Sequence, residues 1–155
     1  MAPSVHLRRA GFRLAYRCMQ VFWFVAQPRA EGVKCLLTAG DRVLLVRHTY
    51  GRRVWDLPGG GVKRSEEPLA AARREMEEEL GLRDAAWRPA GIVRGRQNHR
   101  HDLVHCFQAE LRSEDVEPNL AELAEVGWFD RRAVPDRTGP YVRPVLDGAL
   151  GPTDA

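Results

Sequence analysis

GGVKRSEEPLAAARREMEEELGL, residues 60–82, is the most informative segment of this 155-residue chain. When residues 68–80 are projected at about 100° per residue, three carboxylates fall on one helical face: Glu75, Glu78 and Glu79. A group of apolar residues lies on another face: Leu69, Ala72, Met76 and Leu80. We therefore predict a helix that packs one face on a core and holds carboxylates on the other. Ala71 projects onto the carboxylate side, where its small side chain would leave room for a metal-bound polyphosphate.

The predicted helix has recognisable ends. Glu67 is followed by Pro68, a residue favoured at the first helical position, and Gly81 suits the left-handed conformation that commonly ends a helix. The preceding LPGGG run predicts a tight loop that can turn the carbonyl of Gly60 toward a ligand. Clustered carboxylates repel one another unless cations neutralise them, and hard oxygen ligands suit magnesium or manganese. A divalent-cation site is therefore expected beside the helix.

The same segment matches, at every specified position, the pattern G-x5-E-x7-R-E-U-x-E-E-x-G-U, where U is a bulky aliphatic residue. The chain thereby resembles the Nudix hydrolases. The matching residues are Gly60, Glu66, Arg74, Glu75, Met76, Glu78, Glu79, Gly81 and Leu82. The resemblance covers about residues 32–150 and implies the α/β Nudix fold, an α/β/α sandwich on a mixed β-sheet.

The resemblance also implies an activity and a cofactor. The activity is metal-dependent hydrolysis of a diphosphate linkage in a nucleoside diphosphate linked to another moiety, such as a nucleoside triphosphate, ADP-ribose or a nucleotide sugar. Water would attack phosphorus. Two or more Mg²⁺ or Mn²⁺ ions would be held by a set of oxygen ligands: Glu75, Glu78, Glu79 and the Gly60 carbonyl. Arg74 would orient a carboxylate or contact a phosphate, and Glu66 would brace the loop or Arg74.

A further glutamate lies downstream in AELAEVGWFD, residues 121–130, which resembles the family's late segment. Glu122 and Glu125 are both candidates for an additional metal ligand or catalytic base. The distance of Glu122 before Trp128 favours Glu122. Three residues stay open as the general base that takes the proton from water: Glu75, Glu79 and Glu122.

The residues before Glu66 depart from the family's usual pattern. Many relatives place glycine directly before this glutamate and an acidic residue shortly upstream, where this chain has Ser65 and the basic pair Lys63 and Arg64. That pair could meet a substrate phosphate or face solvent. Family markers for NADH, coenzyme A, ADP-ribose and diadenosine polyphosphate substrates are absent. The candidate substrate contacts are Trp55, Lys63, Arg64, Asn98 and His99.

Apolar runs predict the remaining elements. A hairpin over residues 32–47 would turn at Ala39, Gly40 and Asp41. A polar loop is expected over residues 97–102, and a closing helix over residues 138–150 would begin near Thr138 and Pro140. Further strands are expected over residues 54–57, 91–96, 103–111 and 126–129.

Residues 1–31 form a predicted N-terminal amphipathic helical arm that precedes a Nudix domain over residues 32–155. Projection of residues 5–26 gives an aromatic stripe, Phe12, Tyr16, Met19 and Trp23, and an aliphatic stripe, Leu7, Leu14, Cys18, Val21 and Val25. A helix with two apolar faces must bury both. One would pack on the domain, while the other would form a homodimer or contact a membrane surface; we expect the homodimer. The apolar run over residues 18–26 is too short to span a bilayer of roughly 30 Å.

Composition is typical of one small enzyme domain with a core. The net charge of +3 is mild, so no nucleic-acid surface is required, although capped RNA stays among the candidate substrates. The three cysteines are widely spaced, which indicates a reduced cytoplasmic protein rather than a disulfide scaffold. A signal peptide is a weaker alternative, because bulky Phe24 or Pro28 stands where cleavage needs a small residue.

Two classes of function follow. The first is a Nudix pyrophosphohydrolase. The second is a non-catalytic module that keeps the Nudix fold to sense a nucleotide without turnover. The complete set of glutamates favours the enzyme, because a sensor has no need of all of them.

Overall fold

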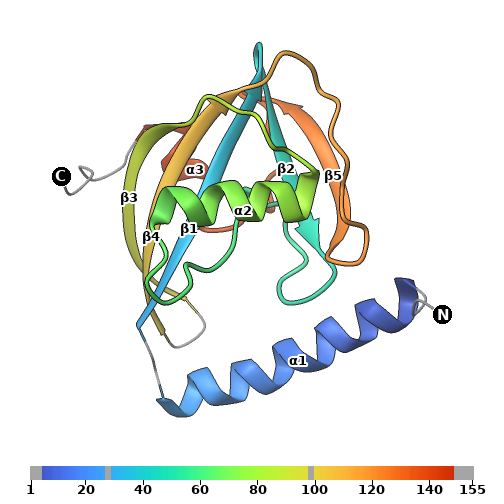
Figure 1. The fold of residues 1–155 in the computed structure, drawn as a ribbon, viewed down its shortest axis with the longest axis vertical. Coiled ribbons are helices and arrows are strands. Elements are labelled where there is room, and N and C mark those ends of the chain that lie inside the picture. Colours follow the sequence, from blue (N-terminus) through green and yellow to red (C-terminus); the bar gives the residue numbers. More distant parts are fainter. Residues whose placement is uncertain (1–4, 27–28, 98–99, 149–155) are drawn as a thin grey trace.

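The computed structural model describes residues 5–26, 29–97 and 100–148, and Figure 1 shows their arrangement. A mixed sheet of five strands has the order β3-β4-β1-β2-β5. β1 pairs in parallel with β4, and every other neighbouring pair is antiparallel. The strands are β1 Arg29–Ala39, β2 Arg42–His48, β3 Arg88–Gln97, β4 Arg100–Glu110 and β5 Leu123–Asp130. The predicted hairpin is confirmed, and β1 begins three residues before the expected start of the domain.

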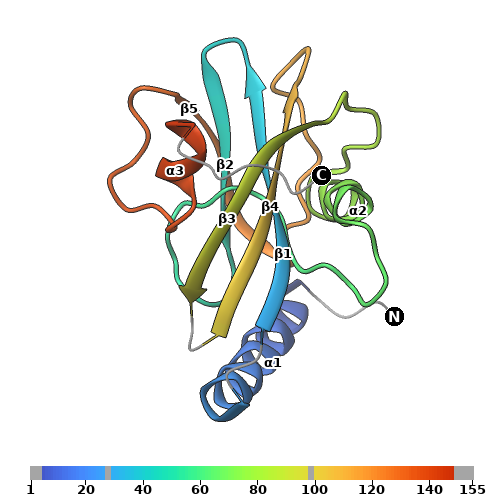
Figure 2. The ribbon, with the colours of Figure 1, turned by 90° about the vertical axis from the view of Figure 1, so that its left-hand side faces the viewer.

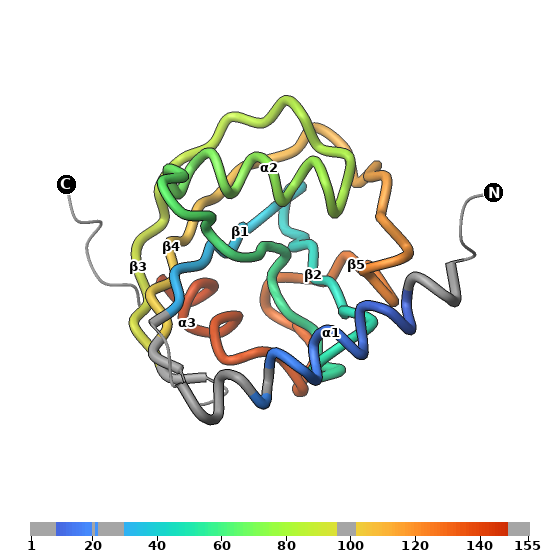
Figure 3. The backbone as a smooth tube through the Cα atoms, turned by 60° about the horizontal axis from the view of Figure 1, so that its bottom comes forward, coloured from blue at the N-terminus to red at the C-terminus, as the bar shows by residue number. Residues whose placement is uncertain are grey.

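Helices cover both faces of this sheet. α2 (Pro68–Leu80) lies on one face and α3 (Val142–Leu146) on the other, as Figure 2 shows. α1 (Val5–Ala26) crosses one end of the sheet (Figure 3). The α/β/α sandwich on a mixed sheet and the added N-terminal helix are therefore confirmed.

The alternation of side chains along β1 builds two cores. Val33, Cys35 and Leu37 join the cluster that α2 covers, whereas Leu36 joins the cluster around α3. Successive side chains of a strand point to opposite faces, so Lys34 emerges on the α3 side. Lys34 is therefore a charged residue of β1 that stands between two buried neighbours, Val33 and Cys35.

α2 has the predicted bounds. Its first backbone bond runs from the Ala71 N–H to the Glu67 carbonyl, and the Glu67 side chain makes no capping bond. Gly81 ends the helix at φ 67°. Ala71 is fully buried with Ala72 and Met76, so the expectation that it borders a bound polyphosphate is wrong. The face of α2 that carries the carboxylates is therefore partly buried, because Ala71 and Glu79 both lie in the core.

The strands expected over residues 91–96, 103–111 and 126–129 are present as β3, β4 and β5, but three other predicted elements need correction. The closing helix is only α3, because Thr138 bridges Trp55 in extended backbone and Gly148, at φ 67°, ends the last turn. The predicted loop over residues 97–102 is wrong in part, since the β3–β4 ladder continues to the Gln97–Arg100 pair. Residues 54–57 make isolated bridges instead of a strand.

α1 has the predicted bounds, and Phe12 and Tyr16 of its aromatic stripe face the domain. Phe12 and Tyr16 both contact Tyr50, which follows β2. Leu14 and Val21 of the aliphatic stripe are exposed, by 65% and 67%. The homodimer and the membrane contact stay predictions. Along the described parts of the chain, none of the helices is both long and apolar enough to cross a membrane.

Candidate active site

The glycine loop, residues 57–61, leads into α2 and lies directly against β1. Gly59 has φ 143°, and a Cβ there would overlap the Val33 carbonyl. Its N–H donates to Glu79 Oε2 at 3.1 Å. A Cβ at Gly60 would overlap the Glu75 carboxylate. Only glycines therefore allow the loop to lie against both strand and carboxylates.

The Gly60 carbonyl, expected to turn toward metals, accepts the Val33 N–H at 2.9 Å. A carbonyl oxygen has a second lone pair, so this bond orients the peptide and leaves the oxygen able to accept again. The role of Gly60 as a metal ligand stays a prediction.

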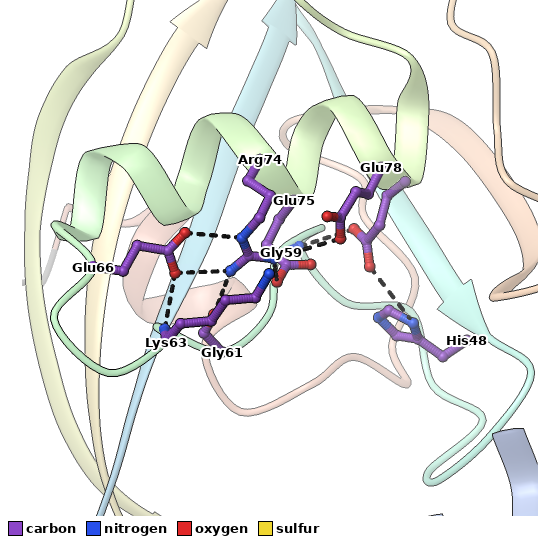
Figure 4. Close-up of polar contacts among 9 residues, drawn as sticks. His48, Gly59, Gly61, Lys63, Glu66, Arg74, Glu75 and Glu78 are labelled. Carbon is purple, nitrogen blue, oxygen red and sulfur yellow. Dashed lines mark hydrogen bonds and ion pairs between the residues drawn. The ribbon is translucent and has the colours of Figure 1, made fainter.

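Arg74, in the middle of α2, pairs with three glutamates (Figure 4). Its Nε and one terminal nitrogen bind both oxygens of Glu66, at 2.8 and 3.0 Å. The other terminal nitrogen contacts Glu75 Oε1 at 2.6 Å and Glu78 Oε2 at 3.4 Å. Hydrogen bonding to Arg74 lowers the pKa of Glu66 to about 2. The expected bracing of loop and arginine by Glu66 is present, and Glu66 also accepts the Lys63 N–H.

Glu79 is the buried member of the cluster, with 1% of its surface exposed. Burial raises its pKa to about 8, although Lys34 and the Gly59 N–H oppose the rise. The nearby charges of Glu75 and Glu122 add to it. A negative charge on Glu79 is therefore unfavourable unless a cation joins the cluster.

His48 was not anticipated from the sequence. It is the last residue of β2, and its Nδ1 lies 3.8 Å from Glu79 Oε1 (Figure 4). That nitrogen is buried without a hydrogen-bond partner among the described residues. Burial, with the Lys34 charge, lowers the pKa of His48 to about 4, so the ring is neutral at pH 7. The only sequence signal was its place at the end of a buried strand.

Glu122 and Glu125 occupy different surroundings. Glu122 is half-buried in the turn before β5, where its carboxylate accepts from the Asn119 amide at 3.2 Å. Its charge is among those that raise the pKa of Glu79. Glu125 instead pairs with Arg47 at 2.9 Å on the surface. Of the two glutamates, Glu122 is therefore the one whose charge acts on Glu79.

The three predicted substrate contacts that the structure describes lie in different surroundings. Trp55 packs edge-on against Phe129, with ring centroids 4.8 Å apart, and Arg47 covers its ring. Lys63 and Arg64 are exposed on the loop before α2. Asn98 and His99 lie outside the described residues.

The donor set fits divalent cations, although its present conformation is not that of a loaded site. Within residues 5–26, 29–97 and 100–148, no three His, Cys, Asp or Glu side chains converge on one ion position, because Glu75 and Glu78 turn to Arg74. Glu79 is a buried carboxyl beside two further carboxylates, and a cation would relieve that repulsion. Rotation of Glu75 and Glu78 would complete an all-oxygen ligand set.

Sequence comparison agrees with this geometry. Residues 28–147 match the model of the NUDIX domain. The chain belongs to the Nudix family. A MutT Nudix hydrolase from Burkholderia pseudomallei has the same fold, with a TM-score of 0.69 and 25% identity over 79% of this chain and 98% of that one.

Several similar proteins have names that state an activity, and two of them illustrate the range. An RNA pyrophosphohydrolase of Rhodospirillum rubrum is 41% identical over 138 residues, which cover 77% of this chain and 84% of the relative. Diphosphoinositol polyphosphate phosphohydrolase 2 of Rattus norvegicus is 34% identical over 89 residues, covering 57% of this chain and 50% of the relative. The chain spans about half the length of several relatives that it matches, the rat protein among them.

Proposed function

We propose that this Nudix protein hydrolyses a diphosphate linkage in a nucleoside diphosphate linked to another moiety, with Mg²⁺ or Mn²⁺ as cofactor. The observation that carries the proposal is the buried carboxyl of Glu79, placed between the glycine loop and two further carboxylates. Ionisation of such a buried carboxyl is unfavourable unless a cation neutralises the charge. Both named relatives described above are phosphohydrolases or pyrophosphohydrolases, which supports the same reaction class.

The residues divide the work by position. Glu75, Glu78 and Glu79, with Glu122 and the Gly60 carbonyl, would hold two or more ions. When bound, the cations would neutralise the diphosphate and lower the pKa of a water. Arg74 holds Glu75 in its resting position and would orient it for the metal. The base that receives the proton from water is Glu75, Glu79 or Glu122.

A substrate panel tests the activity. The full chain is incubated with nucleoside triphosphates, ADP-ribose, nucleotide sugars, dinucleoside polyphosphates, a diphosphoinositol polyphosphate and capped RNA, each with Mg²⁺, with Mn²⁺ or with chelator. Glu79→Gln should lower turnover by at least about 100-fold, while Glu77→Gln, on the exposed side of α2, should leave it unchanged. In ¹⁸O-labelled water, the label should enter a phosphate product.

Two outcomes contradict the proposal. Turnover that survives chelator, or that survives Glu79→Gln, would remove the carboxylate site from the reaction. Metal-dependent binding of a nucleotide without turnover of any compound would instead identify a sensing module.

A further inference from the structure

α1 forms one wall of a cavity at the glycine loop. The cavity has a volume of about 420 Å³ and is lined by α1, by the start of β1 and by Gly59, Gly60 and Gly61. This volume lies in the range typical of small-molecule sites, about 300–1,000 Å³. The loop borders both the cavity and the carboxylates, so a diphosphate at Glu75 and Glu79 would place its attached group in the cavity. α1 itself lies outside the matched Nudix region, residues 28–147.

The wall of this cavity toward α1 is aromatic. Phe12 and Tyr16 come from α1, and Tyr50 comes from the segment after β2. The ring of Tyr50 lies 6.1 Å from that of Phe12, at an interplanar angle of 23°, and 5.3 Å from that of Tyr16. Tyr16 also packs so closely on Gly51 that a Cβ there would lie 2.9 Å from its Cζ. The rings therefore form a packed surface on which a flat group can stack.

The aromatic wall stands beside the carboxylates. Burial raises the pKa of Tyr50, and the charges of Glu79, Glu122 and Glu75 raise it further. Tyr50 also contacts His48, with ring centroids 5.2 Å apart. A group stacked on these rings would thus remain within reach of the diphosphate site.

Two arginines fix α1 to the loops around Glu122. Arg9 Nε donates to the Leu120 carbonyl at 2.8 Å, and Arg13 Nε donates to the Thr49 carbonyl at 3.0 Å. The N–H of Thr49 in turn donates to the Glu122 carbonyl. The position of the aromatic rings is thereby tied to the turn that carries a candidate catalytic residue.

The opposite side of the cavity is polar and acidic. Lys34 pairs with Asp56 at 2.8 Å, and buried Asp102 accepts from the Tyr141 hydroxyl at 3.0 Å. Glu31 adds another carboxylate. Among the described residues, this wall carries one lysine and three carboxylates, and Glu31 also bonds to His105 Nε2 at 2.7 Å. That balance disfavours a polyanion such as a phosphorylated inositol ring, whereas the remaining lone pairs of the carboxylate oxygens suit the N–H groups of a base.

We propose that this cavity binds the nucleobase of the substrate and that α1 supplies its stacking surface, an inference that rests on the proposed diphosphate hydrolysis. Phe12 and Tyr16 are then specificity residues that stand outside the matched Nudix region. The substrate class follows: a nucleoside diphosphate derivative, and not a base-free polyphosphate.

Calorimetric titration of the full chain tests this inference, with Mg²⁺ present and hydrolysis-resistant ligands. The ligands are the α,β-methylene analogues of ADP and GDP, and methylenediphosphonate, which has the same diphosphonate group without a nucleoside. Tyr16→Ala and Phe12→Ala should each weaken binding of the better nucleotide analogue by about 10- to 100-fold. Binding of methylenediphosphonate should change less than about threefold.

Matched controls separate stacking from folding. Tyr16→Phe keeps the ring and should bind the analogue nearly as the parent does. Leu14→Ala changes a residue of α1 that is 65% exposed, so its binding of the analogue should also match that of the parent. Equal loss for both ligands in Tyr16→Ala and Phe12→Ala, or no loss for either ligand, would overturn the base site. The panel assay tests the proposed hydrolysis independently of these measurements. Selective nucleotide binding without turnover would refute hydrolysis and leave the base site supported. Turnover together with unchanged binding in both variants would support hydrolysis and refute the base site.

Discussion

Replacement of Glu79 by glutamine should stabilise the metal-free protein at alkaline pH. The amide is almost the same size as the carboxyl, and its oxygen can still accept the Gly59 N–H. The substitution therefore changes mainly the charge of a group that has 1% of its surface exposed. The expected effect is the removal of a buried negative charge.

The size and sign follow from the pKa of Glu79. Burial raises it from 4.5 to about 8, and a tenfold change in proton affinity corresponds to about 1.4 kcal/mol. The protonated carboxyl therefore contributes stability that is complete below pH 4.5 and lost as the pH rises through 8. Glu79→Gln lacks this loss, so its advantage in free energy of unfolding should grow from near zero at pH 4.5 to a few kcal/mol, at most about 5, by pH 9.

Urea unfolding in chelator, followed by tryptophan fluorescence between pH 5 and 9, measures the difference. Glu77→Gln is the matched control, because Glu77 is exposed on the same helix. Mg²⁺ should then stabilise the parent selectively, since the cation binds the ionised carboxylate. A difference between Glu79→Gln and parent that does not change with pH would refute the burial argument.

Two further substitutions probe α2 and the loop that precedes it. Arg74→Lys replaces a guanidinium that binds both oxygens of Glu66 and also Glu75, and a lysine cannot reproduce that fork. The kcat on the best panel substrate should therefore fall about 10- to 100-fold. Arg73→Lys, on the exposed face of α2, should match the parent, and equal effects of the two substitutions would argue against a positioning role for Arg74. Ser65 has φ 62°, a conformation that disfavours residues with a side chain. Ser65→Gly should therefore raise the free energy of unfolding by up to about 1 kcal/mol in urea titrations. A decrease would show that the serine side chain makes a stabilising contact of its own.

Local patterns were sufficient to predict much of this fold. The bounds of α1 and α2 follow from helical periodicity and from Pro68 and Gly81, because these signals act within a few residues. The hairpin turn at Gly40 was predictable for the same reason. The closing helix was overestimated because its start depends on the bridge between Thr138 and Trp55, a contact between distant segments that periodicity does not contain.

The candidate site, too, could be predicted only in part from local sequence patterns. The spacing of the glutamates predicted their gathering on one face of α2, but not the burial of Glu79 or of Ala71, which depends on how the helix rests on the sheet. His48 reaches Glu79 only because β2 ends beside the glycine loop. The place of Phe12 and Tyr16 in the cavity depends on α1 crossing the end of the sheet (Figure 3).

The parallel pairing of β1 with β4 has a kinetic consequence. Hairpins such as β1–β2 close short loops, but each of residues 29–38 of β1 meets a partner in β4 that is 72 positions away in the chain, as Arg29 meets His101. Contacts at such separation form slowly, because the entropy of closing a long loop is lost before they stabilise anything. During folding, α2 can therefore exist as a helix before the central strand that receives the glycine loop is in place. Catalytic competence should appear with the slowest phase of refolding.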